Sequence, residues 1–232
     1  MWSRPLVVGE EPLEVHLVLE AEADESLSYK ISAASSIESS EAVYSQGRVS
    51  VGRPLVEAVQ TLDLQAVRSR CTEGQASGAV CYEAFRKLGL EYGPSHQTIA
   101  ELQWGQGDTV LHPGMVDGAL QASIALLAGD QIAEVLRFTA LEGAVSLESA
   151  PLASATERYG NPPLPFALEE AEVISPCQAH MWAVVRVRPE PAASSAAEAR
   201  VRKLDLMLCD SEGQVCIRLR GVTSRVPESR EG

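Results

Sequence analysis

Alternation of apolar and polar positions marks the first fifty residues. Leu13–Leu19 alternates in its first half, Ser28–Ser32 alternates again, and shorter runs follow at 42–45 and 48–51. Short runs of this kind, separated by acidic or serine-rich turns, are typical of an antiparallel meander. The pattern therefore predicts a sheet, and it predicts no helix of any length among these strands.

A connector follows the predicted meander. Weak helical turns are expected between residues 55 and 70, and the GQASG segment at 74–78 is a flexible break. We therefore place a domain boundary near residue 75. It separates residues 1–75, which hold the strands and the connector, from residues 76–232.

The strongest helical signal lies in the segment LHPGMVDGALQASIALL, which begins at residue 111. Steps of three and four residues relate the apolar positions Val116, Leu120, Ile124 and Leu127. Residues at this spacing form one stripe on a helix. Pro113 suits the first turn of that helix, because its missing N–H would have no partner there. We therefore expect a helix over residues 113–128 whose stripe is buried.

Strands dominate the rest of the second part. A short helix is predicted over Val80–Leu88, ended by Gly89, and a strand over Gln97–Trp104. Further strands are expected at 163–174 and 181–188. A long sheet with a single early apolar helix buries the helix by wrapping around it. The expected architecture is therefore α+β, a hot-dog fold, preceded by a set of strands without its own helix.

A hairpin near the end of the chain has the clearest alternation. Apolar residues alternate on both arms, at Leu204, Leu206 and Leu208 and at Val215, Ile217 and Leu219. The turn between the arms is Asp210-Ser211-Glu212-Gly213, and its glycine suits a positive φ. Two strands joined at this turn are expected to bury one leucine-rich face.

Composition narrows the possible partners. Of the 232 residues, 45% are apolar and 22% are charged, as in soluble globular proteins. The formal net charge of -13 argues against binding to nucleic acid or to an anionic membrane. No apolar run approaches the roughly 20 residues that span a bilayer. No secretory signal is visible. The five cysteines form no CxxC pair, so no zinc site is expected, and free thiols suit the cytoplasm.

A cluster of basic residues could still dock an acidic protein. The residues close together in sequence are Arg186, Arg188, Arg200, Arg202 and Lys203. The other interpretation of this cluster is that these side chains are solvated at strand edges.

Asp117 and Gln121 are the leading candidates for chemistry. They are four residues apart, so on a helix they are neighbours and could together hydrogen-bond a hydroxyl group. Burial would raise the pKa of the Asp117 carboxyl toward that of a general acid, whereas a helix N-terminus would lower it. The same spacing also fits a first-turn acid and a solvated glutamine.

Other residues give weaker signals. Each of the four histidines could act as a base, but a lone histidine is more often structural. Tyr92, Gly93 and Pro94 form a turn or line a pocket. The sequence contains no phosphate-binding loop, no GxSxG and no metal-ligand cluster.

Four segments, taken together, resemble the dehydratase domain of bacterial modular polyketide synthases, especially those whose acyltransferase is a separate protein. They are YGPSHQ (92–97), LHPGMVDGALQ (111–121), PLPFALEEAEV (163–173) and the hairpin (201–225). The opening WSRPLVVGEEPLEVHL is similar to later strands of the first hot dog of that domain. The resemblance implies a double hot-dog fold in which the first hot dog is incomplete.

The resemblance also implies a reaction. In this family a histidine of an HxxxGxxxxP motif removes the α-proton of a β-hydroxyacyl chain, which is carried on the phosphopantetheine of acyl carrier protein. An aspartate of DxxxQ then protonates the departing hydroxyl. Asp117 matches that acid, and Gln121 matches its hydrogen-bonding helper. The positions that match substrate-binding loops near the tunnel are Tyr92, Gly93, Pro94, His112 and Pro113.

The resemblance implies partners and no cofactor of the chain's own. The partners are acyl carrier protein and neighbouring synthase domains, and a homodimer is typical of such synthases. This sequence, however, contains no HxxxGxxxxP. Elimination needs a base as well as an acid. We therefore expect either a dehydratase whose histidine comes from an upstream segment, or a non-catalytic scaffold or branching domain that binds the carrier. Isomerisation is less expected, because shifting variants of the family keep the histidine and lose the aspartate.

An incomplete first hot dog has a physical consequence. Strands without their helix expose sheet edges and apolar surface. We therefore expect exposed apolar side chains in the first part of the chain.

Overall fold

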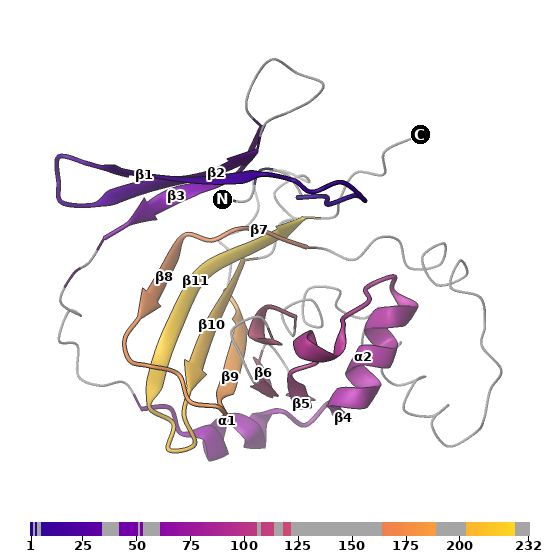
Figure 1. Ribbon diagram of the computed structural model, residues 1–232. Coiled ribbons are helices and arrows are strands. Elements are labelled where there is room, and N and C mark those ends of the chain that lie inside the picture. The colour runs from indigo at the N-terminus through magenta and orange to yellow at the C-terminus, as the bar shows by residue number, and fades with distance from the viewer. Residues whose placement is uncertain are drawn as a thin grey trace, which may run out of the picture. The chain divides into compact units, whose positions relative to one another are not determined.

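The computed structural model describes residues 1, 3, 6–33, 42–50, 52, 61–105, 108–113, 118–121, 164–188 and 203–225. The chain forms two compact units, Met1–Glu57 and Ala58–Gly232 (Figure 1). This division lies earlier than the boundary expected near residue 75. The reason is that the described part of the connector, from residue 61 on, pairs with the second unit: Thr61 bridges Gln214, and β4 (Gly74–Ser77) pairs with β5 (Ile99–Trp104).

The first unit is a three-stranded antiparallel meander. Its strands, in sheet order, are β1 (Val15–Ala21), β2 (Leu27–Ala33) and β3 (Ala42–Val49). The strands predicted near 13–19 and 28–32 are confirmed, whereas the two runs at 42–45 and 48–51 form one strand. The described residues of this unit contain no helix.

One face of this sheet carries apolar side chains, and those on β1 are exposed to solvent. Because side chains alternate along a strand, Val15, Leu17 and Leu19 of β1 share a face. Their exposed fractions are 42%, 62% and 57%. Residues on the same face of β2 lie opposite them, as in the pair Leu17 and Ile31. The exposure expected of an incomplete hot dog is therefore present in this unit.

The second unit is built on one antiparallel sheet of eight described strands. Its order is β4, β5, β6 (Asp108–Pro113), β9 (Trp182–Val187), β10 (Lys203–Cys209), β11 (Val215–Arg225) and β7 (Leu164–Ala167), and β8 (Glu170–Val173) also pairs with β11. The strands expected near 97–104 and 181–188 and in the terminal hairpin are confirmed. The strand expected over 163–174 is instead two strands, which pair successively along β11.

β6 was not expected as a strand. Its backbone pairs with both β5 and β9, and Pro113 at its end lies opposite Ile99. The prediction that Pro113 occupies the first turn of the long helix is therefore wrong. Helical structure is described at residues 118–121. The rest of the predicted 113–128 helix lies outside the described residues.

Two α-helices begin at side-chain caps. α1 (Leu64–Arg70) starts at Asp63, whose carboxylate accepts the Ala66 N–H at 2.9 Å. α2 (Gly78–Lys87) starts at Ser77 and is followed by Gly89, whose φ of 80° is the left-handed conformation that ends helices. The predicted helix over 80–88 and its glycine stop are therefore confirmed.

Buried apolar side chains lie on both faces of the sheet. On one face Leu204, Leu206 and Leu208, each fully buried, pack in a cluster with Phe85 of α2 and with Ala119. On the other face Val184 packs against Val67 of α1. The alternation read from the hairpin is therefore confirmed, and its leucine face meets α2 and the helical residues 118–121.

A positive-φ glycine closes the hairpin turn, as predicted. Gly213 has a φ of 84°, and the Asp210 carboxylate accepts the N–H groups of Glu212 and Gln214 at 2.9 Å each. A Cβ added to Gly213 would lie 2.1 Å from the Leu62 carbonyl oxygen. The turn is therefore packed against the chain that precedes α1.

Gly213→Ala is expected to lower the free energy of unfolding by at least roughly 1–2 kcal/mol, because an L-residue must be held in the left-handed conformation. Displacement of the Leu62 carbonyl adds to this loss. Urea unfolding measures the effect. Gly93→Ala is the matched control, because Gly93 has a φ of -65° and no atom near an added Cβ. Equal stability of the two variants would contradict the prediction.

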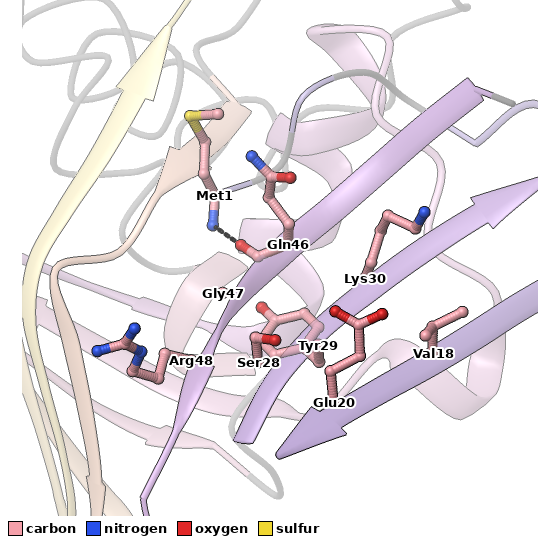
Figure 2. A pocket seen from close by; sticks show the side chains of 9 residues that line it. All are labelled: Met1, Val18, Glu20, Ser28, Tyr29, Lys30, Gln46, Gly47 and Arg48. Carbon is pink, nitrogen blue, oxygen red and sulfur yellow. Dashed lines mark hydrogen bonds between the residues drawn. The ribbon is translucent and has the colours of Figure 1, made fainter. Parts of the chain in front are cut away.

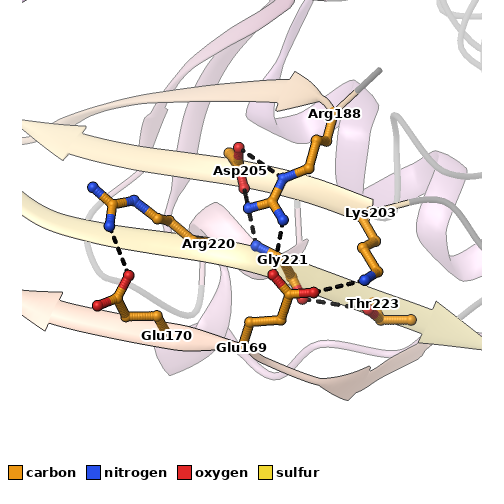
Figure 3. A network of polar contacts seen from close by, with 8 residues as sticks. All are labelled: Glu169, Glu170, Arg188, Lys203, Asp205, Arg220, Gly221 and Thr223. Carbon is orange, nitrogen blue, oxygen red and sulfur yellow. Dashed lines mark hydrogen bonds and ion pairs between the residues drawn. The ribbon is translucent and has the colours of Figure 1, made fainter. Parts of the chain in front are cut away.

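Two residues of the predicted basic cluster, Arg188 and Lys203, pair with carboxylates. Arg188 contacts Asp205 at 2.6 Å and Glu169 at 2.8 Å, and Lys203 contacts Glu169 at 2.6 Å (Figure 3). Lys203 and Arg188 hold the pKa of the Glu169 carboxyl below its usual value. Arg200 and Arg202 lie outside the described residues. Arg188 and Lys203 therefore hold neighbouring strands and the β7–β8 turn together.

A bulge in β11 belongs to the same network. The Asp205 carboxylate accepts the Gly221 N–H at 2.9 Å, and Gly221 has a φ of 64° (Figure 3). The register of the β10–β11 pair shifts at this point. Asp205 therefore binds both Arg188, which directly follows β9, and the backbone of the bulge.

Candidate functional site

Gln121 is a buried polar residue in the core of the second unit. Its exposed fraction is 2%, so the interpretation of a solvated glutamine is wrong. Its amide nitrogen donates to the His96 carbonyl oxygen at 3.0 Å, and its amide oxygen accepts from the Tyr82 hydroxyl at 3.0 Å. Both ends of the amide are therefore held by the protein, as buried polar groups require.

Tyr82 joins Gln121 to the sheet. Its hydroxyl oxygen accepts the N–H of Ile99 in β5 at 2.8 Å and lies 3.3 Å from the His96 carbonyl oxygen. Burial raises the pKa of the Tyr82 phenol, so the group is a neutral donor at physiological pH. The Tyr82 hydroxyl therefore connects α2 with β5 and with the helical residues 118–121.

The Tyr92–Gln97 loop, residues 92–97, is fixed beside this hydroxyl. Pro94–His96 forms a single 3-10 turn, and the Gln97 side chain donates to the Tyr92 carbonyl oxygen at 2.7 Å. The Tyr92 ring packs edge-on against the Tyr82 ring, with centroids 6.0 Å apart. It also packs against the ring of Phe85, at 5.6 Å. The structure therefore brings the Tyr92-Gly93-Pro94 motif and Gln121, which are distant in sequence, to one place.

The remaining predicted residues are described less fully. His112 and Pro113 are in β6, whose backbone pairs with β5, and the Pro113 position lies opposite the Ile99 that contacts Tyr82. Asp117 lies outside the described residues. His96 takes part through its carbonyl oxygen, which accepts from Gln121.

A family model described as the polyketide synthase dehydratase N-terminal domain matches residues 59–141 and 146–231. The chain belongs to the polyketide synthase dehydratase family. The matched ranges contain Tyr82, the Tyr92–Gln97 loop, Asp117 and Gln121, so the candidate site lies wholly within the family domain.

Curated relatives of this dehydratase-family chain are much longer proteins. The chain is 27% identical over its whole length to polyketide synthase PksM of Bacillus subtilis. It is 31% identical over 99% of its length to PksL of the same species. It spans about 5% of each relative. The relatives are therefore large synthases to which this chain corresponds only in one segment.

Solved dehydratase domains have the same fold. A trans-AT polyketide synthase dehydratase domain from Brevibacillus brevis is 29% identical, with a TM-score of 0.64, and the match covers 98% of this chain and 74% of that one. The dehydratase domain from the CurF module of the Curacin synthase has a TM-score of 0.67 at 20% identity, with the same coverages. The fold of this dehydratase-family chain is therefore the expected α+β hot dog.

Tyr82 is a site residue that the sequence analysis missed. Its helix was predicted, but its partners Ile99 and Gln121 are 17 and 39 residues away along the chain. One signal was present, since a tyrosine on the apolar face of a core helix needs a partner for its hydroxyl. That signal identifies a buried hydrogen bond without saying which group makes it.

A shallow cleft lies on the polar face of the first unit. Glu20, Lys30 and Arg48, from three adjacent strands, are among the residues that line it, and the Met1 amino group donates to the Gln46 carbonyl oxygen at 2.8 Å (Figure 2). Solvated side chains of both signs line it. It lacks a buried amide and hydroxyl pair of the kind found at Gln121 and Tyr82.

Other classes of site receive no support from the described ranges. Within them no three His, Cys, Asp or Glu side chains are grouped to hold a metal ion. Nor does the described part of the chain contain a helix of the length and apolarity that a bilayer crossing requires. The five cysteines, all described, form no disulfide, and burial raises the pKa of the Cys81 and Cys209 thiols to about 12.

Proposed function

We propose that this chain acts as a polyketide synthase dehydratase domain. It would remove water from a β-hydroxyacyl chain on the phosphopantetheine arm of acyl carrier protein and leave an α,β-unsaturated thioester. The observation that carries the proposal is the buried contact of Gln121, the last residue of the DxxxQ motif, with the loop that follows Tyr92-Gly93-Pro94. Two family motifs thus share one hydrogen-bond network.

The proposed reaction divides its proton transfers between two groups. A base takes the α-proton, the electrons of that C–H bond form the new C=C bond, and the C–O bond to the β-hydroxyl breaks. Asp117, protonated beforehand, gives its proton to the departing oxygen, so that water leaves and the carboxylate remains. The base would be a histidine outside the present sequence, because the sequence contains no HxxxGxxxxP.

Gln121 would support the acid in this reaction. Its amide is rigidly held, because a fully buried side chain with partners at both ends has little rotational freedom. Asp117 lies four residues before Gln121 in the sequence, and if the helix includes both residues, a rigid amide there would hold the leaving hydroxyl beside the acid. The chain would need no cofactor of its own, and it would work in the cytoplasm, beside other synthase domains and in a homodimer.

The test compares two proteins in one assay. One is the chain of 232 residues, and the other is the same chain with any coding sequence that precedes it in frame. Each is mixed with a β-hydroxyacyl acyl carrier protein, and loss of water is followed by mass spectrometry while carrier binding is followed by calorimetry. We expect both proteins to bind the carrier and only the extended one to remove water.

The other outcomes distinguish the alternatives. Carrier binding without water loss in both proteins would favour the non-catalytic scaffold or branching domain. Absence of both binding and water loss would contradict either function.

A further inference from the structure

The Tyr82 hydroxyl has a defined donor direction. A phenol has one proton to donate and can also accept hydrogen bonds. The Ile99 N–H, at 2.8 Å, uses an accepting position, so the phenol proton is directed to an oxygen. The Thr98 side chain also interacts with this hydroxyl. Of the two oxygens toward which the phenol donates, the Gln121 amide oxygen at 3.0 Å is nearer than the His96 carbonyl oxygen at 3.3 Å.

The same contacts select one orientation of the Gln121 amide. In the observed orientation the amide nitrogen faces the His96 carbonyl and the amide oxygen faces the Tyr82 hydroxyl. Rotation of the amide by half a turn would set two oxygens against each other at the His96 contact and leave the phenol without its nearer acceptor. A buried group without its partner costs roughly 1–3 kcal/mol, so the rotated state is disfavoured.

We infer that Tyr82 is a positioning residue of the proposed dehydratase: its hydroxyl holds the Gln121 amide by the oxygen, so that the amide acts toward the leaving hydroxyl as a hydrogen-bond donor. This inference rests on the proposed function. A donor to the departing oxygen stabilises charge that develops there only as the C–O bond breaks. The contribution of Tyr82 therefore belongs to the transition state more than to substrate binding.

Tyr82→Phe in the extended protein tests the inference. The phenylalanine keeps the ring contacts with Phe85 and Tyr92 and removes only the hydroxyl. We expect kcat to fall about tenfold, the effect of about one lost hydrogen bond, and KM to stay constant. In a double-mutant cycle with Gln121→Leu, the double variant should be no slower than Gln121→Leu alone. If the kcat losses of Tyr82→Phe and Gln121→Leu instead multiply in the double variant, the inference is overturned.

A control separates positioning from loss of stability. Tyr82→Phe leaves the Ile99 N–H without its partner and so lowers the melting temperature. Leu88→Ala, in the same core cluster and 3% exposed, removes a larger buried volume without touching a polar group. It should lower the melting temperature further and leave kcat unchanged. An equal loss of kcat in Leu88→Ala would mean that Tyr82 acts only through stability.

A measurement independent of turnover distinguishes this inference from the proposed function. The side-chain amide protons of Gln121, assigned by their absence in Gln121→Leu, should exchange slowly with solvent in the parent protein and faster in Tyr82→Phe. Suppose that exchange is faster in Tyr82→Phe but the parent protein is inactive. The proposed reaction, and with it the catalytic part of the inference, would then be overturned. The hydrogen bond by which Tyr82 holds Gln121 would still be supported. Unchanged exchange would overturn that hold.

Discussion

Asp117→Asn in the extended protein is expected to abolish water loss and to leave the melting temperature nearly unchanged. Asparagine matches aspartate in size but has no acidic proton to give to the departing hydroxyl. General acid catalysis contributes about 10²–10⁴-fold, so turnover should fall by at least the lower of these factors. Loss of water from the β-hydroxyacyl carrier, followed by mass spectrometry, measures the change.

Asp205→Asn is the matched control, because it makes the same chemical change elsewhere in the second unit. Asp205 binds Arg188 at 2.6 Å and the Gly221 N–H at 2.9 Å, so this variant should lose stability and retain turnover. The opposite result for Asp117, a lower melting temperature with turnover intact, would identify that residue as a first-turn acid that interacts with the helix dipole.

Elements whose signals are local were predicted from the sequence. The terminal hairpin shows this best, because its alternating leucines and its turn glycine each need only nearby residues to be recognised. α2 was predicted for the same reason, since its periodicity and its stop at Gly89 lie within a dozen residues. β6 was missed, because its His112-Pro113 end has the composition of a loop and its strand character comes from pairing with β5 and β9.

Interactions that depend on tertiary structure were not predicted. The basic cluster was read as a possible docking patch, since its neutralising partners Glu169 and Asp205 are brought to Arg188 by strand pairing. The same holds for Tyr82, whose helix was evident and whose partner Gln121 was not. In the candidate site, sequence motifs therefore pointed to Gln121 and to Tyr92-Gly93-Pro94, whereas Tyr82 and the hydrogen bonds of Gln121 were found only from the fold.

The exposed face of the first unit fits the proposed function. Leu17 is 62% exposed beside Ile31, its apolar neighbour on β2, and exposed apolar surface of this kind is costly for an isolated unit. A segment that brought the missing histidine would also bring apolar surface able to cover such a face.

Leu206→Ala is expected to destabilise the second unit by about 2–5 kcal/mol. Leu206 is fully buried at the centre of the hairpin, where it is paired with Leu219 and packed in the cluster that contains Phe85. Removing its branched end leaves a cavity between the sheet and α2, and a close-packed core collapses only partly around such a cavity. Urea unfolding followed by tryptophan fluorescence measures the loss, since Trp104 and Trp182 both belong to this unit.

Val173→Ala is the matched control for Leu206→Ala. Val173 lies in the same sheet and pairs with Ile217, but it is 73% exposed. Its truncation removes an apolar group that stays in water, so the change should remain within about 0.5 kcal/mol. A similar small change in Leu206→Ala would mean that the leucine face is not the core of this unit. The hairpin would then not be the part of the core that supports Tyr82 and Gln121.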